Sequence, residues 1–163
     1  MASVHDVAAA IVERVGSCST MKLQKLVYYC QAWHLVWDEE PLFPDRIEAW
    51  AGGPVVRSLY EQHRGRFTVT AWPMGNSRNL SVSERETVEA VVGAYSHLSG
   101  QQLSVMTHRE HPWRDARARA GLGPGERGDQ EITREALQDY YAAVDQDPDA
   151  RDVESLPTDL LSE

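Results

Sequence analysis

The spacing of hydrophobic residues predicts a mainly helical chain. In residues 4–15, apolar side chains recur at intervals of three and four residues, which places them on one face of a helix. Ser3 stands before this stripe as a candidate N-cap, and Gly16 follows it as a stop signal. The stripe consists of Val4, Val7, Ala8, Ile11 and Val12.

The next predicted helix, residues 21–38, is apolar around most of its circumference. One face carries Leu23, Leu26, Val27, Cys30, Trp33, His34 and Trp37, and the opposite side carries Tyr28, Leu35 and Val36. A helix that is hydrophobic on most sides is buried inside a protein. We therefore expect this helix, capped by Ser19 or Thr20 and ended before Pro41, to form the centre of the fold.

Short strands are predicted at two places. Residues 47–50 alternate between apolar and polar types, as a half-buried strand does. Residues 67–71 are rich in strand-forming types, and we expect them to pair with that first strand. Gly52-Gly53 forms a turn, and Pro54 suits the first turn of a third helix over residues 54–63.

Four further helices are expected in the second half of the chain. They cover about 83–98, 99–107, 112–121 and 134–144, with start signals at Ser83 and Glu86, Ser99 and Gln102, Pro112, and Thr133. The complete pattern predicts a mainly α (α+β) fold. It has about seven helices around the central hydrophobic helix, with a small antiparallel sheet of two or three strands.

The length and the charge distribution fit one domain followed by an acidic tail. The chain has 163 residues, and we assign residues 1–144 to a single domain. Residues 145–163 hold seven acidic side chains and one arginine, so they carry −6 of the total charge of −9. We expect this tail to be solvated or disordered. The acidic balance argues against binding to nucleic acid or to an anionic membrane and suits a basic protein partner.

Other sequence features point to a cytoplasmic protein. The N-terminal segment lacks the basic leader of a signal peptide, and no apolar run reaches the roughly 18 residues that a membrane span needs. The chain has only two cysteines, Cys18 and Cys30, which argues against a disulfide framework.

No pattern for catalysis, metal binding or cofactor binding survives inspection. His108 and His111 are three residues apart and Pro112 follows directly, whereas a zinc-protease helix needs histidines four residues apart. Packing of these histidines and Trp113 against the core explains the same residues. Cys30 lies on an apolar face, and Cys18 has no visible base beside it. We therefore predict no enzyme activity, no catalytic residue, no metal and no cofactor.

Several linked motifs resemble the Panacea-domain family of SocA-like antitoxins. The resemblance covers about residues 5–144. Its motifs are Met21-Lys22-Leu23-Gln24-Lys25-Leu26-Val27-Tyr28-Tyr29-Cys30-Gln31-Ala32-Trp33-His34, Pro41-Leu42-Phe43, Ile47-Glu48-Ala49-Trp50, Gly53-Pro54-Val55-Val56 with Tyr60, Thr107-His108-Arg109-Glu110-His111-Pro112-Trp113, and Ile132 with Tyr140-Tyr141.

This resemblance implies a helical single domain that neutralises a cognate toxin by direct protein–protein binding. Family members pair with very different toxins, and we expect the toxin here to be the product of the adjacent gene. The family offers no catalytic residue to transfer. The candidate partner-binding residues are Lys22, Lys25, Tyr28, Tyr29, Trp50, Gly53, Pro54, Tyr60 and Trp113. Core packing is the alternative role for each of them.

Three other functions stay open at this point. Some family members act as adaptors that present a toxin to a protease, and such an adaptor would shorten the lifetime of the toxin. Arg109, Arg114, Arg117 and Arg119 form a basic patch that suits either nucleic acid or solvent, although no helix-turn-helix follows the domain. An enzyme that uses His108 and His111 is the third alternative.

Overall fold

The computed structural model describes residues 1–147, and residues 148–163 lie outside the described part of the chain. The described part confirms a mainly α fold with seven α-helices and small antiparallel sheets. The helices are α1 (Val4–Val15), α2 (Thr20–Trp37), α3 (Arg57–His63), α4 (Val82–Tyr95), α5 (Gly100–Arg109), α6 (His111–Arg119) and α7 (Arg134–Gln146). The short elements are β1 (Cys18–Ser19), β2 (Ile47–Trp50), β3 (Gly53–Val55), β4 (Thr68–Val69), β5 (Glu131–Ile132) and the 3-10 helix η1 (Ser77–Asn79).

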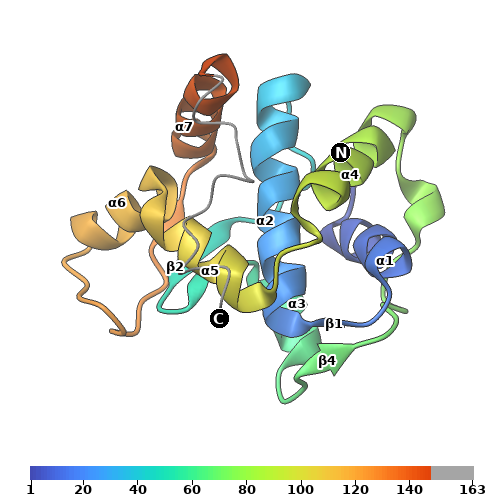
Figure 1. Ribbon diagram of the computed structural model, residues 1–163, viewed down its shortest axis with the longest axis horizontal. Coiled ribbons are helices and arrows are strands. Elements are labelled where there is room, and N and C mark those ends of the chain that lie inside the picture. Colours follow the sequence, from blue (N-terminus) through green and yellow to red (C-terminus); the bar gives the residue numbers. More distant parts are fainter. Residues whose placement is uncertain (148–163) are drawn as a thin grey trace.

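Helix α2 lies at the centre, as its hydrophobic pattern predicts. Figure 1 shows α1 and α4 on one side of α2 and α5, α6 and α7 on the other, and α2 contacts α1, α4, α5 and α7. Every residue of α2 from Leu23 to Leu35 is buried. The predicted cap is confirmed, because the Ser19 side chain accepts a hydrogen bond from the backbone N–H of Lys22 at 3.0 Å. A helix covered on all sides must satisfy its polar side chains internally.

Two buried glutamines of α2 do this by holding the backbone of other segments. The Gln24 amide donates to the Val56 carbonyl at 3.1 Å and accepts from the Val56 N–H at 2.9 Å. The Gln31 amide donates to the Phe43 carbonyl at 2.9 Å and accepts from the Leu42 N–H at 2.6 Å. Each side-chain amide thus satisfies one backbone N–H and one backbone carbonyl of a segment that follows α2, as a neighbouring β-strand would. Since the two glutamines are seven residues apart, they lie on the same face of the helix.

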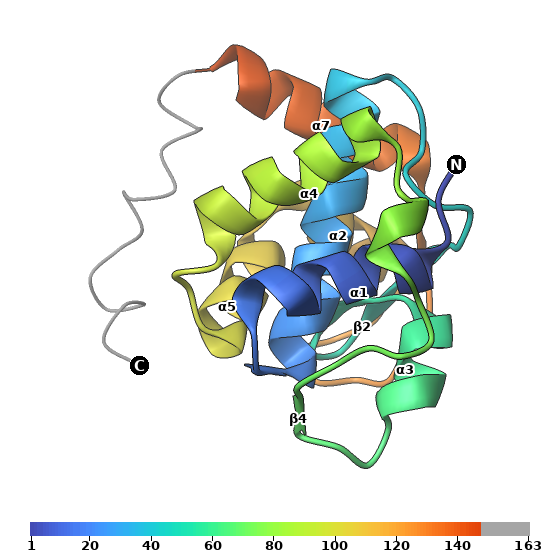
Figure 2. The same ribbon diagram turned by 90° about the vertical axis from the view of Figure 1, so that its right-hand side faces the viewer.

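The strands form two separate antiparallel sheets. In one sheet the order is β3-β2-β5, and in the other β1 pairs with β4. The prediction that residues 67–71 pair with the first strand is therefore wrong. Both edges of β2 are already occupied, by β3 through a tight turn and by β5, while β4 pairs Val69 with Cys18. Figure 2 shows β4 at the lower edge of the molecule, below α1 and beside α3.

Two predicted helix starts are also wrong. Pro54 lies in the edge strand β3, where its missing N–H costs no hydrogen bond, and α3 begins only at Arg57. The capping box of α4 uses Ser81 and Glu84 instead of Ser83 and Glu86, so this helix begins two residues earlier and ends at Tyr95.

The other predicted caps are confirmed. Ser3 caps α1, and Thr133 caps α7. Ser99 and Gln102 form the expected capping box at the start of α5. Helix α7 continues to Gln146, past its predicted end at Val144, and the remainder of the predicted acidic tail lies outside the described residues. In the described part of the chain, no helix combines the length and apolar character needed to cross a bilayer.

The buried glutamines give a first testable prediction. Gln31→Leu leaves the Phe43 carbonyl and the Leu42 N–H buried without a partner, so the free energy of unfolding should fall by about 2–4 kcal/mol. Urea unfolding of the purified full chain measures this change. Gln101→Leu on the exposed face of α5 is the matched control and should change stability by less than about 0.5 kcal/mol. Equal effects of the two substitutions would contradict the proposed backbone-holding role.

Candidate functional site

The turn between β2 and β3 lies against the buried lysine of α2. Lys25 is only 3% exposed, and its Nζ donates to the Pro54 carbonyl at 3.3 Å. Burial lowers the pKa of Lys25 to about 8. Gly53 has a φ of +127°, and a Cβ at this position would lie 2.5 Å from Lys25 Cε. The turn therefore requires glycine for both its backbone conformation and its close approach to the lysine.

Helix α5 holds the same turn from the other side. Ser104 Oγ donates to the Gly52 carbonyl at 2.6 Å. The His108 ring stacks on Trp113, with centroids 3.9 Å apart and planes at 2°. His108 Nε2 is buried and has no hydrogen-bond partner among the described residues, and burial lowers the pKa of this imidazole. The predicted packing is therefore confirmed for His108 and Trp113, whereas it is wrong for His111, whose side chain is exposed.

Helix α6 fixes the backbone of β2 through two side chains. Trp113 Nε1 donates to the Trp50 carbonyl at 2.8 Å, and Arg117 donates to the Ala49 carbonyl at 3.0 Å. The Arg117 guanidinium also lies over the Trp113 ring, 5.3 Å from its centroid. Arg117 is thus a buried structural residue, which removes it from the predicted basic patch and leaves only the exposed Arg109, Arg114 and Arg119.

On its outer side, the same β2–β3 turn borders a surface pocket. Trp50 Nε1 donates to Glu48 at 2.8 Å, and the same carboxylate accepts from Arg57 at 2.8 Å. Arg57 lies over the Trp50 ring at 5.4 Å, and Tyr60 packs edge-on against it at 4.8 Å. The pocket has a volume of about 420 Å³ and is lined by Trp50, Ala51, Gly52, Arg57, Arg127, Gly128 and Asp129.

We refer to Trp50, Arg57, Tyr60 and the pocket beside them as the Trp50 surface. Its three large side chains are of the types that most often dominate binding energy at protein interfaces. Their mutual contacts hold them in one arrangement before any partner arrives, which reduces the entropy lost on binding. The Trp50 surface is therefore the part of the predicted site that is both accessible and ordered.

The remaining predicted site residues lie elsewhere. Lys22 Nζ donates to the Ser96 carbonyl at 2.5 Å, at the C-terminal end of α4. Tyr28 and Tyr29 are buried between α2 and α7, so they are not accessible to a partner in this structure. The structure gives Lys22, Lys25 and both tyrosines intramolecular roles, and their contact with a partner stays a prediction.

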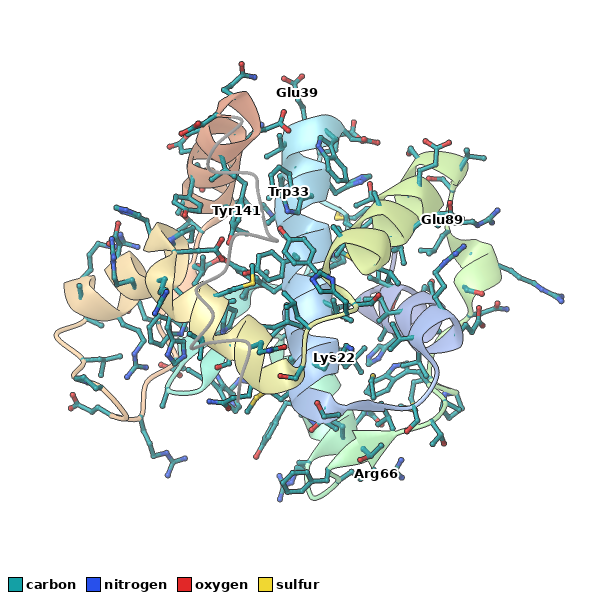
Figure 3. All side chains as sticks on the ribbon, viewed as in Figure 1. Lys22, Trp33, Glu39, Arg66, Glu89 and Tyr141 are labelled. Carbon is teal, nitrogen blue, oxygen red and sulfur yellow. The ribbon has the colours of Figure 1, made fainter. Side chains whose placement is uncertain are left out.

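The two tyrosines belong to a cluster of hydrogen-bonded side chains around Glu110, which sequence reasoning missed. Glu110 Oε1 accepts from the Tyr29 hydroxyl at 2.5 Å and from the Tyr141 hydroxyl at 3.0 Å. Tyr28 and Tyr141 share a further hydrogen bond at 3.0 Å. Tyr141 also packs edge-on against Trp33 at 5.5 Å, and Figure 3 shows these two side chains close together between α7 and α2.

This cluster changes the acidity of its central carboxyl group. Burial raises the pKa of Glu110 from 4.5 to about 7, although the two tyrosine hydrogen bonds favour the charged form and oppose the rise. Glu110 joins α5 to α6, whereas its donors come from α2 and α7. Its hydrogen bonds therefore connect three parts of the helical bundle.

The described residues offer little for catalysis. Cys18 and Cys30 are buried free thiols, and burial raises the pKa of both, which disfavours the reactive thiolate. No group of three or more His, Cys, Asp or Glu side chains between residues 1 and 147 is placed to hold a metal ion. The geometry around the turn supports binding through side chains and backbone better than it supports a reaction.

Comparison with known proteins gives one match. The family model described as "Antitoxin SocA-like, Panacea domain" matches residues 23–114, which is more than half of the chain. This range contains most of α2, the β2–β3 turn, the Trp50 and Tyr60 side chains, and the His108–Trp113 pair. No curated protein and no solved structure matches the chain.

The two glycines of the turn give a matched pair of substitutions. Gly53→Ala combines a backbone conformation unfavourable for alanine with a contact to Lys25, so we expect a loss of about 1–3 kcal/mol of stability. Gly52→Ala meets nothing within 4 Å and should stay within about 0.5 kcal/mol of the parent. Urea unfolding of both variants tests the difference, and equal stabilities would contradict the close packing of Gly53 on Lys25.

Glu110 predicts a pH dependence of stability. The unfolded carboxyl loses its proton near pH 4.5 and the folded one near pH 7, so the folded state binds the extra proton between these values. The free energy of unfolding contributed by Glu110 should therefore fall as pH rises from 4.5 to 7, by about 3 kcal/mol in total.

Glu110→Gln keeps an oxygen acceptor for both tyrosines and removes the titration. Urea unfolding at pH 5 and pH 8 should show the variant gaining stability relative to the parent at the higher pH. Glu86→Gln, on the exposed side of α4, controls for the loss of one carboxylate. Parallel pH profiles of Glu110→Gln and the parent protein would rule out a titrating Glu110.

Proposed function

We propose that this chain, which belongs to the family of SocA-like antitoxins with a Panacea domain, neutralises a cognate toxin by binding it directly. Family membership supports a role in a toxin–antitoxin pair and suggests a non-catalytic one. The step to direct neutralisation is our proposal, and it rests on the character of the Trp50 surface.

The Trp50 surface is the observation that carries this proposal. A tryptophan, an arginine and a tyrosine lie in mutual contact beside a pocket of about 420 Å³. The carboxylate of Glu48 receives hydrogen bonds from both Trp50 and Arg57, so the arrangement does not depend on a partner. An ordered surface of this composition suits a stable protein complex better than a transient encounter.

The turn that supports this surface suggests how binding and folding are related. Gly52 and Gly53 follow Trp50 after one residue, Ala51. Lys25, Ser104 and Trp113 hold this turn from the inside. The inner residues of the predicted site then act as positioning residues, and the outer ones make the contact. Gly53, Pro54 and Trp113 would then support binding by positioning the Trp50 surface, without touching the toxin themselves.

We further propose that the toxin is the product of the adjacent gene and that the pair meets in the cytoplasm. The two free cysteines are compatible with a reducing compartment. The chain would bind its toxin stoichiometrically and block either the active site of the toxin or its folding.

Co-expression with the product of the adjacent gene tests the proposal. If that product alone arrests growth, and growth returns together with a stable complex that can be pulled down, direct neutralisation is supported. If growth returns while the toxin disappears, the chain acts as an adaptor for proteolysis. If the product is harmless and nothing co-purifies, the proposal fails.

Substitutions at the Trp50 surface sharpen this test. Tyr60→Ala and Trp50→Ala should each weaken binding of the adjacent gene product at least about tenfold, because each removes a large preordered contact. Trp37→Ala is the matched control, since Trp37 is 43% exposed and lies at the C-terminal end of α2. Isothermal titration calorimetry measures the affinities, and thermal unfolding checks that each variant is folded. Unchanged affinity for both variants at the Trp50 surface would contradict its assignment as the interface.

A further inference from the structure

The loop between α3 and β4 carries the most exposed large hydrophobic side chain in the described part of the chain. Phe67 is 91% exposed, and Arg64 and Arg66 beside it are exposed as well. We call residues 64–67 the 64–67 loop. Figure 2 shows it at the lower end of the molecule, and Figure 3 labels Arg66 at that end, far from Tyr141. A phenylalanine this exposed contributes almost nothing to the core.

The backbone of this loop is nevertheless held at several points. The Arg64 N–H donates to the Tyr60 carbonyl at 2.8 Å, and the Arg66 N–H donates to the His63 carbonyl at 2.9 Å. The Phe67 carbonyl accepts from the Thr20 N–H at 3.0 Å, which ties the loop to the start of α2. Gly65 has a φ of +84° and permits the tight turn between these bonds. The loop therefore presents its side chains from a fixed backbone.

The two arginines have no partner to neutralise them within the described residues. Neither guanidinium forms a hydrogen bond or an ion pair there, whereas Arg57 on the same helix–loop segment is paired with Glu48. Arg14 and Arg46 likewise have acidic partners. Two unpaired cations close to an exposed aromatic ring in the sequence give this end of a net-acidic molecule a local positive charge.

We propose that the 64–67 loop is a second contact with the toxin, in which Phe67 enters an apolar socket whose rim carries carboxylates. This inference rests on the proposed function and adds the chemistry of the partner surface. The socket excludes water from the phenyl ring, and the carboxylates pair with Arg64 and Arg66. Because the backbone is already ordered, little conformational entropy is lost when the loop binds.

The position of the loop supports a contact with the same partner that covers the Trp50 surface. Arg57 and Tyr60 are three residues apart on α3 and share one face of it, and the backbone of Arg64 caps the end of that helix. Helix α3 has only seven residues, so it spans about 10 Å at 1.5 Å per residue. A protein interface of ordinary size covers both ends of such a helix.

Protein suits this loop better than nucleic acid. Strong binding to DNA needs several phosphate contacts from a basic surface. Here the loop offers two arginines, Glu61 lies exposed on the adjoining helix, and the whole chain carries a charge of −9. An acidic protein surface needs only local charge complementarity, and it also provides the apolar socket that the phenyl ring requires.

Affinity measurements with the adjacent gene product test this contact. Phe67→Ala and the double variant Arg64→Glu/Arg66→Glu should each weaken its binding to the full chain at least about tenfold. The effect of the charge reversal should shrink when salt is raised from low to high concentration, while the effect of Phe67→Ala should not. Arg64→Lys/Arg66→Lys keeps the charge and should restore most of the affinity.

Two controls match these changes elsewhere on the molecule. Val82→Ala removes another exposed apolar side chain, 70% exposed at the start of α4, and should leave the affinity unchanged. Arg78→Glu/Arg85→Glu reverses two exposed charges and controls for net charge. The altered side chains of the 64–67 loop are exposed, so thermal unfolding should show that the test variants are folded.

The outcomes separate this inference from the proposed function. If Tyr60→Ala weakens the complex and the variants of the 64–67 loop do not, the second contact is refuted and direct neutralisation stands. A loss with Phe67→Ala but not with charge reversal refutes an acidic socket. If the charge reversal abolishes a gel shift with promoter DNA and leaves toxin affinity intact, the loop binds nucleic acid and the proposal is overturned. If the parent chain forms no complex, both proposals fail together.

Discussion

The fold depends on the polar side chains that α2 carries into the core. Gln24, Lys25 and Gln31 are each buried, and each holds the backbone of a segment that follows α2 in the sequence. Hydrophobic burial alone would leave those segments free to slide, because it has no direction. A buried amide has donors and acceptors at fixed positions, so it accepts only one placement of the backbone opposite it. The central helix thereby sets the positions of residues 42–43 and 54–56.

This arrangement connects the core with the Trp50 surface. Lys25 holds the carbonyl of Pro54, and Gln24 holds both backbone groups of Val56, so the chain on either side of Val55 is fixed from within. Trp50 lies opposite Gly53 in the β2–β3 ladder. The position of the partly exposed Trp50 therefore depends on contacts that Gln24 and Lys25 of α2 make with the neighbouring strand.

Sequence reasoning predicted the central helix correctly and the strand pairing incorrectly. The signal for the helix is local, whereas the signal for the pairing is not. Helix α2 can be recognised from its own residues, because apolar side chains on all of its faces indicate burial and Ser19 marks its start. The pairing of Val69 with Cys18 depends on residues fifty positions apart, and two-residue strands carry almost no periodic signal. Pro54 was misplaced because the same fixed φ suits both a helix start and an edge strand. The pairing of Pro54 with Ala49 in the β2–β3 ladder decides between them, and Lys25 holds the Pro54 carbonyl in that place.

The candidate site was predicted in the same uneven way. Trp50 and Tyr60 are exposed enough to bind a partner, whereas Tyr28 and Tyr29 are of the same chemical type and lie in the core. There the Tyr29 hydroxyl donates to Glu110, and the Tyr28 hydroxyl shares a hydrogen bond with Tyr141. Residue type alone does not distinguish these cases, because tyrosine suits a buried hydrogen bond as well as an interface. The folded chain makes the distinction, because α2 is buried without interruption from Leu23 to Leu35, whereas Trp50 and Tyr60 are partly exposed.

The residues that hold the fold are separate from those that the outer surface presents. The residues that fix the backbone lie inside, at Gln24, Lys25 and Gln31, and their hydrogen bonds tolerate little change. The exposed side chains of the 64–67 loop make no contact that the fold requires, since backbone hydrogen bonds and Gly65 hold that loop. Exposed residues of this kind can be exchanged at small cost in stability. A domain with such an interior can therefore exchange its exposed side chains without altering its fold.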